Sequence, residues 1–294
     1  QEDVYGWKID SNLKAYIEGA YQRNMRLAFR VVVDSRDKRT EFTPQFVKDA
    51  GAKGFMNKGK WSPYSDDSVF QKYYTKFVKA LAKDFNDPSK VEFIDGFGLG
   101  KWGEYHTMIY STGDDTPKKA VFDWVTDIYS QVFDKVPVVI NYHRWIGAGK
   151  DWVDDEHFAA DSEEMLEEAI KKGYSLRHDA FGMTTYYGSW ERRFAKKYRN
   201  ICPIIMEGGW IVKSHSYWQD PRGYRKDSHE DVRRGEFDDS KEAHVNMMDF
   251  RFGDTESWFK DAFDLVRRFL REGGYRLYPS EISLPLEVSK KTTP

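Results

Sequence analysis

Apolar residues follow two periods that alternate along the chain. Short, nearly continuous apolar runs are typical of strands buried on both faces, whereas a spacing of three and four residues is typical of helices. The predicted strands cover residues 27–34, 52–56, 91–98, 136–141, 176–183, 202–206 and 245–250. The predicted helices cover residues 10–23, 44–50, 67–84, 117–133, 162–172, 189–199 and 255–272. This alternation predicts an α/β fold with a parallel sheet, and the number of units favours a (β/α)8 TIM barrel.

The first predicted element is a helix, so the barrel lacks its first strand. Counted from Arg26, an eight-stranded barrel is one strand short. Three explanations stay open: the strand lies upstream of Gln1, another chain supplies it, or the barrel is incomplete. We expect the barrel to cover residues 1–274. Residues 275–294 alternate like an edge strand and then become polar, which is consistent with the start of a C-terminal β-sandwich.

Composition excludes several classes of protein. The 294 residues include 46 Lys+Arg and 48 Asp+Glu, so no global basic field favours a nucleic-acid partner. The single cysteine cannot form an internal disulfide, and no apolar run is long enough to span a membrane. Phosphate-loop, dinucleotide and zinc motifs are absent from the sequence, so we predict no cofactor and no metal. Ten tryptophans leave aromatic side chains available for a binding surface.

Two glutamates follow predicted strands in similar surroundings. Glu104 comes after the 91–98 strand and Glu207 after the 202–206 strand, each beside glycine and near tryptophan (Trp102 and Trp210). In a barrel the carboxyl ends of the strands carry the chemistry. A pair of carboxylates facing one another is the minimum requirement for glycoside hydrolysis, and indole rings stack on the apolar faces of sugars.

One stretch of the chain resembles a known group of proteins. Residues 93–98 with Trp102-Gly103-Glu104-Tyr105-His106 are similar to the Trp-Gly-Glu-aromatic-His signature of bacterial TIM-barrel proteins. These proteins are related to the glycoside hydrolase clan that includes the family 42 β-galactosidases. Residues 7–10, 27–31 and 86–88 agree with the resemblance, which runs over most of the chain.

The resemblance implies roles for particular residues. Glu104 would be the acid/base and Glu207 the nucleophile of a retaining enzyme, and the missing first strand would lie just upstream of Gln1. The clan normally carries an asparagine before the acid/base, where this chain has Gly103. Arg30 would support the nucleophile, although a buried ion pair without a role in the site is an alternative.

Further candidates are chosen by their position at strand ends. The predicted substrate-binding residues are Arg30, Trp102, His106, Asn141, Tyr142, His143, Asp179, Tyr186 and Trp210. His178 lies inside a strand and is expected to be a core histidine. Residues 211–239 are predicted to form a long polar loop, whose basic side chains either favour an acidic sugar or simply face solvent.

The sequence therefore predicts a glycoside hydrolase that cleaves O-glycosyl bonds in an oligosaccharide or polysaccharide. A carbohydrate-binding barrel without hydrolysis is one alternative. A metal-dependent enzyme that modifies polysaccharides, using His106, His143, His178 and Asp179, is another. An N-terminal segment or a partner chain would complete the barrel. The substrate class implies an extracellular or periplasmic location, while the sugar, its linkage and the oligomeric state stay open.

Overall fold

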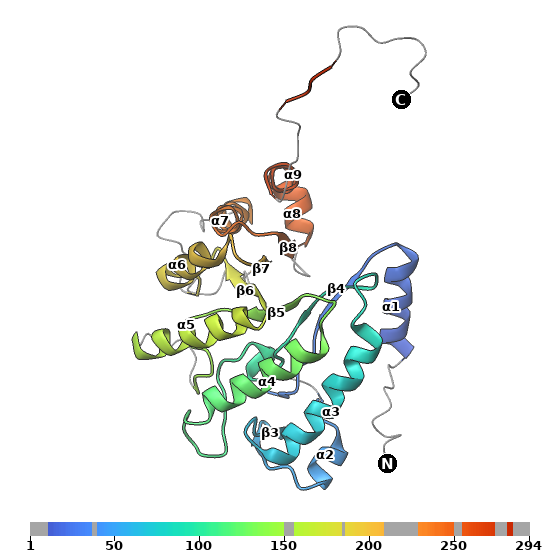
Figure 1. Ribbon diagram of the computed structural model, residues 1–294, viewed down its shortest axis with the longest axis vertical. Helices are drawn as coiled ribbons and strands as arrows, with labels where there is room; N and C mark the ends of the chain where they lie inside the picture. Colours follow the sequence, from blue (N-terminus) through green and yellow to red (C-terminus); the bar gives the residue numbers. More distant parts are fainter. Residues whose placement is uncertain are drawn as a thin grey trace.

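Six parallel strands form the central sheet of the protein. The computed structural model describes residues 11–36, 40–149, 156–183, 186–208, 229–249, 255–273 and 281–284. The strands are β1 (Leu27–Arg30), β4 (Val91–Asp95), β5 (Val138–Asn141), β6 (Ser175–Phe181), β7 (Ile204–Gly208) and β8 (Met247–Asp249), and they are adjacent in that order. Every neighbouring pair is parallel. The sheet and its helices form part of a (β/α)8 barrel, which confirms the predicted fold (Figure 1).

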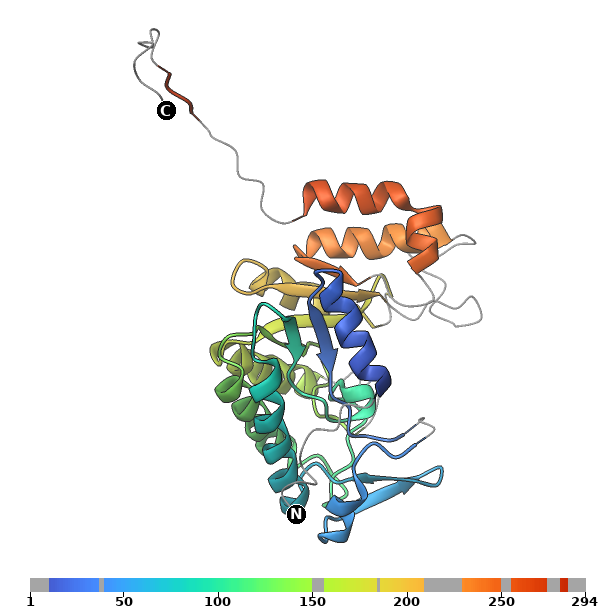
Figure 2. The same ribbon diagram turned by 90° about the vertical axis from the view of Figure 1, so that its right-hand side faces the viewer.

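Helices connect the strands and cover the outside of the sheet (Figures 1 and 2). They are α1 (Ser11–Gln22), α2 (Gln45–Asp49), α3 (Ser68–Phe85), α4 (Lys118–Val132), α5 (Glu156–Lys171), α6 (Ser189–Tyr198), α7 (His229–Glu242), α8 (Thr255–Asp261) and α9 (Phe263–Glu272). The side chain of Asp67 caps α3 by accepting a hydrogen bond from the backbone N–H of Phe70. The predicted helix 255–272 is interrupted at Ala262, which separates α8 from α9.

The two faces of the sheet have different side chains because strand residues alternate. The outer face packs on the helices and is apolar, with Ile94, Val138, Ile140, Leu176, Ile204 and Met206 in the main core. Toward the amino ends of the strands, the inner face carries a smaller apolar group, Phe93, Val139 and Ile205, with Met247 packed against it. The next inward position of each of these strands, at its carboxyl end, is polar: Asp95, Asn141, Glu207 and Asp249. On the inner face, the alternation therefore places an apolar layer, here called the apolar floor, toward the amino ends of the strands and polar side chains at their carboxyl ends.

The predicted strand 52–56 exists but does not join this sheet. It is β2 (Gly54–Asn57), which pairs antiparallel with β3 (Lys60–Pro63) in a separate hairpin. A tight turn joins the two strands, with positive φ at Lys58 and Gly59. The backbone N–H of Ser35 donates to Oγ of Ser62 at 2.8 Å, which ties the hairpin to the chain that leaves β1. The expectation of seven barrel strands was therefore wrong, since β1 pairs directly with β4.

Within the described residues, β1 and β8 are the two edges of the sheet. The predicted loop 211–239 is wrong in its second part, because α7 begins at His229; residues 209–228 lie outside the described residues. Residues 281–284 belong to no strand. The rest of the predicted C-terminal strand is outside the description, so the β-sandwich stays a prediction. Within the described part, no helix is both long and apolar enough to cross a membrane.

Candidate active site

The carboxyl ends of the strands bring charged side chains together on the inner face of the sheet. Arg30 of β1 is in register with Asp95 of β4, and Asn141 of β5 is in register with Arg177 of β6. Glu207 occupies the corresponding inward position of β7, two residues beyond Ile205. Because these positions share one face of the sheet, residues distant in sequence meet at the mouth of the barrel.

The loop that carries Glu104 has an unusual backbone. Between Gly98 and Thr107 the chain enters the left-handed region at six residues: Gly98, Gly100, Trp102, Gly103, Tyr105 and Thr107. Three of these are not glycine, with φ of 56° at Trp102, 58° at Tyr105 and 49° at Thr107. Such conformations cost free energy and persist where the surroundings enforce them, which is common at functional sites. Here Tyr105 anchors the loop, since its hydroxyl donates to the carbonyl of Lys118 at 2.6 Å.

Glu104 is buried, with 5% of its surface exposed, and is surrounded by polar partners. Its Oε1 accepts a hydrogen bond from Nη1 of Arg30 at 2.9 Å, and its Oε2 lies 3.3 Å from Nε2 of His106. Its backbone carbonyl accepts from Nε2 of His143 at 2.9 Å. Burial, with a contribution from His106, lowers the pKa of His143 to about 3. His143 is therefore neutral at pH 7 and holds the backbone of Glu104.

Glu207 shares a partner with Glu104. Nη2 of Arg30 lies 3.8 Å from Oε2 of Glu207, while Nη1 of the same guanidinium holds Glu104. Glu207 also forms an ion pair with Arg177 through the same Oε2. The side chain of Glu207 is 16% exposed and that of Glu104 is 6% exposed, so Glu207 is the more accessible of the two. One guanidinium thus joins the two carboxylates that the sequence analysis paired.

Asp179 of β6 adds a third carboxyl to this group. Asn141 donates to its Oδ1 at 3.4 Å, and Nδ1 of His178 lies 3.7 Å from the same oxygen. Burial alone would raise the pKa of Asp179, but the interactions with His178, Glu104 and Arg177 outweigh it and lower that pKa. Asp179 is therefore ionised at pH 7.

Two charged residues of the site were missed by the sequence analysis. Arg177 and Asp95 are both buried, and Nη1 of Arg177 lies 3.4 Å from Oδ2 of Asp95. Nε of Arg30 donates to the same oxygen at 2.7 Å. Each residue is a buried charge within a predicted strand. Such a position could have been recognised as a site candidate from the sequence, because unpaired charges are almost never buried.

The remaining predicted residues divide between the site and its surroundings. Trp102 is 40% exposed, with Lys101 over its ring and His106 edge-on to it. Tyr142 does not reach the site: it is fully buried on the outer face, where its ring stacks on Phe194 and its hydroxyl bonds that of Tyr187. The reason is alternation, since Asn141 points inward.

Tyr186 packs against Ala180 and Met183, apart from the glutamates, and Trp210 lies outside the described residues. His178 sits in the aromatic core with Tyr142 and Tyr187, where burial lowers its pKa to about 4. Within the described ranges, no three His, Cys, Asp or Glu side chains are arranged to hold a metal ion.

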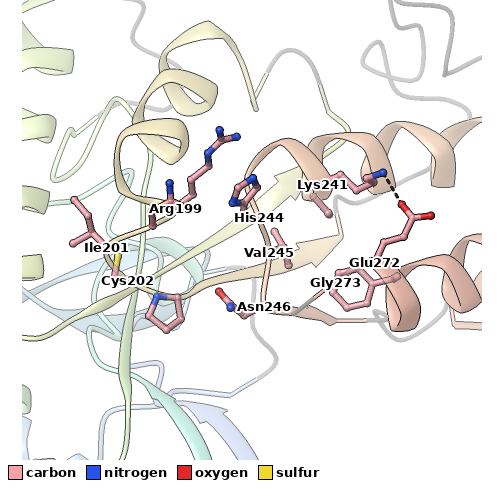
Figure 3. A pocket seen from close by; sticks show the side chains of 13 residues that line it. Arg199, Ile201, Cys202, Lys241, His244, Val245, Asn246, Glu272 and Gly273 are labelled. Atoms are coloured by element: carbon pink, nitrogen blue, oxygen red, sulfur yellow. Dashed lines mark hydrogen bonds and ion pairs between the residues drawn. The ribbon is translucent and has the colours of Figure 1, made fainter. Parts of the chain in front are cut away.

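A groove of about 570 Å³ lies at the opposite end of the strands. It is lined by residues that precede β7 and β8, among them Cys202 and Asn246, and by the end of α9 (Figure 3). Glu207 is at the carboxyl end of β7, so this groove is separate from the glutamates. Its volume alone does not identify it as the place where chemistry occurs.

Comparison with known proteins finds solved structures with a similar fold. No family model and no curated protein sequence matches this chain. The structure of endo-glycoceramidase II from Rhodococcus sp. as a lactosyl-enzyme intermediate is similar, with 14% identity and a TM-score of 0.41 over 81% of this chain and 58% of that chain. The same enzyme in a cellobiose-like imidazole complex gives 12% identity and a TM-score of 0.42 over the same shares. This chain therefore spans less than two thirds of those structures, and the relationship to the family 42 clan stays a prediction.

Proposed function

We propose that the protein is a glycoside hydrolase that acts on an oligosaccharide or polysaccharide through Glu104 and Glu207. The observation that carries the proposal is the Arg30 guanidinium, which lies 2.9 Å from Glu104 and 3.8 Å from Glu207 at the mouth of the barrel. Glycoside hydrolysis requires two neighbouring carboxyl groups, and here one comes from the loop after β4 and the other from β7.

Glu104 is suited to the role of general acid. It is buried beside Arg30 and His106 in the loop that follows β4, the position of the acid/base residue in the clan that this chain resembles. In its protonated form Glu104 would protonate the oxygen of the leaving group, and the resulting carboxylate would then act as the base toward water. His106, 3.3 Å from Oε2, and the Arg30 contact at Oε1 would orient the carboxyl group.

Glu207 is suited to the role of nucleophile. Its partners are the arginines of β1 and β6, which favour the ionised carboxylate. Attack on the anomeric carbon would give a covalent glycosyl-enzyme intermediate, and hydrolysis of that intermediate would retain the configuration of the sugar. The greater exposure of Glu207 is consistent with access to substrate.

Gly103 stands where the clan that this chain resembles has an asparagine, and its surroundings leave little room for a side chain. Its φ is +78°, and a Cβ at this position would lie 2.8 Å from Cδ of Arg30. A side chain here would therefore displace the arginine that joins the two glutamates. We propose that Asn141, at the end of the adjacent strand β5, supplies an amide to the sugar in place of the missing asparagine.

The test is turnover of a panel of nitrophenyl glycosides and oligosaccharides by the parent protein and by Glu104→Gln and Glu207→Gln. We expect each substitution to lower kcat by about 10²–10⁴-fold or more. Glu92→Gln is the matched control, because Glu92 is the second residue of β4, near the amino end of the strand, and pairs with Arg26. Azide should restore activity to Glu207→Ala and yield a glycosyl azide. Equal rates in the parent and both Gln variants would contradict the proposal.

A carbohydrate-binding barrel without hydrolysis is the second candidate. It is favoured by the engagement of both carboxyl groups in ion pairs with arginine. Sugar binding by the parent, unchanged in Glu104→Gln and without turnover of any member of the panel, would support this candidate over the first.

A further inference from the structure

Four side chains at the base of the site form a closed ring of opposite charges. Oδ2 of Asp95 lies 2.7 Å from Nε of Arg30 and 3.4 Å from Nη1 of Arg177. Oε2 of Glu207 pairs with both arginines in turn, at 3.8 Å from Nη2 of Arg30 and in direct contact with Arg177. Each of these two oxygens therefore contacts both guanidinium groups, and within the ring each guanidinium contacts both acids; Arg30 also binds Glu104.

Asp95 is the deeper of the two acids. It is 3% exposed, and it ends β4 in register with Arg30. Its neighbour toward the amino end on the same face is Phe93, which belongs to the apolar floor. Asp95 therefore has little access to a bound sugar, and its effect on chemistry must pass through the arginines.

Two buried arginines side by side are unfavourable without such an anchor. Burial lowers the pKa of Arg177, and the neighbouring charge of Arg30 lowers it further, while Asp95 acts in the opposite direction. Removing one member of a buried ion pair typically costs several kcal/mol of stability. We therefore expect the removal of any one of these four charges to leave the others unfavourably buried. A planar guanidinium that binds two acids also fixes the direction of each.

We propose that Arg177, anchored by Asp95, is a positioning residue that holds the carboxylate of Glu207 ionised and directed toward the mouth of the barrel. The reactive role of Glu207 in this inference rests on the proposed function. The orientation and ionisation of Glu207 do not, so they can be measured without a substrate. Arg30 cannot replace Arg177, because its guanidinium is divided among Asp95, Glu104 and Glu207.

The experiment is a ¹³C NMR titration of the Glu207 carboxyl carbon, assigned by its loss in Glu207→Gln. In Arg177→Met the midpoint should rise by about 1–3 pH units, because the nearest opposite charge is gone. Arg177→Lys keeps a charge without the planar fork and should rise less. Arg144→Met is the control: Arg144 is also a partly buried arginine, but it pairs with Glu191, so the Glu207 midpoint should not move.

A second variant allows the same measurement if Arg177→Met alone does not fold. Asp95→Asn with Arg177→Met removes one buried positive and one buried negative charge together, and its Glu207 midpoint should also lie above that of the parent. A midpoint that does not rise in either folded Met variant would overturn the inference.

Kinetics separate this inference from the proposed function. If the parent turns over a glycoside, Arg177→Met should lower kcat more than it raises KM and should move the acidic limb of the pH profile upward. If no glycoside is turned over while the titration shifts as expected, the proposed function fails and the positioning of Glu207 by Arg177 stands.

Discussion

Arg30 donates from Nη1 to Oε1 of Glu104 at 2.9 Å, although 74 residues separate them in the chain. Arg30→Met should destabilise the protein by about 3–5 kcal/mol, because it removes a buried positive charge that three acidic side chains share. Urea unfolding at pH 7 would measure the change. Arg26→Met is the control on the chain just before the same strand: its pair with Glu92 is largely exposed and should contribute at most about 1 kcal/mol. Equal losses in the two variants would contradict the burial argument.

Gly103→Ala tests why this position lacks a side chain. Both Gly103 and Gly113 have positive φ, at +78° and +82°, but a Cβ on Gly113 would meet nothing within 4 Å. The unfavourable backbone should cost each alanine variant about 1–2 kcal/mol. Gly103→Ala should lose further stability, since its Cβ would collide with Arg30. Urea midpoints of the two variants give the comparison, and identical midpoints would show that Arg30 does not restrict the site.

His143 should make stability depend on pH. Its pKa is lowered to about 3 in the folded protein, while an unfolded histidine has a pKa of about 6.5. The folded state binds fewer protons between these values, so the stabilisation is full above about pH 6.5 and is lost as pH falls toward 3, by about 1.4 kcal/mol per pH unit. The free energy of unfolding of the parent should therefore fall more steeply from pH 7 to pH 5 than that of His143→Gln. Parallel slopes would contradict this.

Trp102→Gly tests the exposed indole as a sugar platform. Glycine accepts the left-handed backbone, so the substitution removes the ring without adding strain. Loss of one stacked ring should raise KM or the sugar Kd by about tenfold, with little change in stability. Phe259→Ala removes a similarly exposed ring from α8 and should leave sugar affinity unchanged. Equal effects of the two variants would exclude a specific platform.

Much of the barrel could be predicted because strand and helix periods differ clearly. The β2–β3 hairpin could not, since a short apolar run such as 52–56 looks the same whether its partner is the sheet or a neighbouring turn. Helix α7 was missed for a different reason. Its buried positions include the charged residues Arg233, Glu236 and Asp239, so no apolar stripe marks it.

Part of the candidate site could be predicted from the sequence, but its most deeply buried charged residues were missed. That Glu104 and Glu207 lie near one another could be predicted because the carboxyl ends of parallel strands meet, a rule that needs no side-chain detail. Tyr142 was misplaced although the alternation of strand residues, applied from Asn141, would have sent it outward. Asp95 and Arg177 were overlooked because each was taken as part of an apolar strand; their pairing across β4 and β6 depends on the three-dimensional fold.

The hairpin has a consequence for how this protein could diversify. It makes no backbone pairing with the parallel strands, and its link to them runs through side-chain contacts such as Ser62 Oγ to Asp34 at 3.3 Å. Insertions or deletions at its turn would thus leave the hydrogen-bond ladder between β1 and β4 untouched. Since the hairpin lies outside the parallel sheet, related chains could lengthen or shorten it without disturbing the strands that carry Arg30 and Asp95.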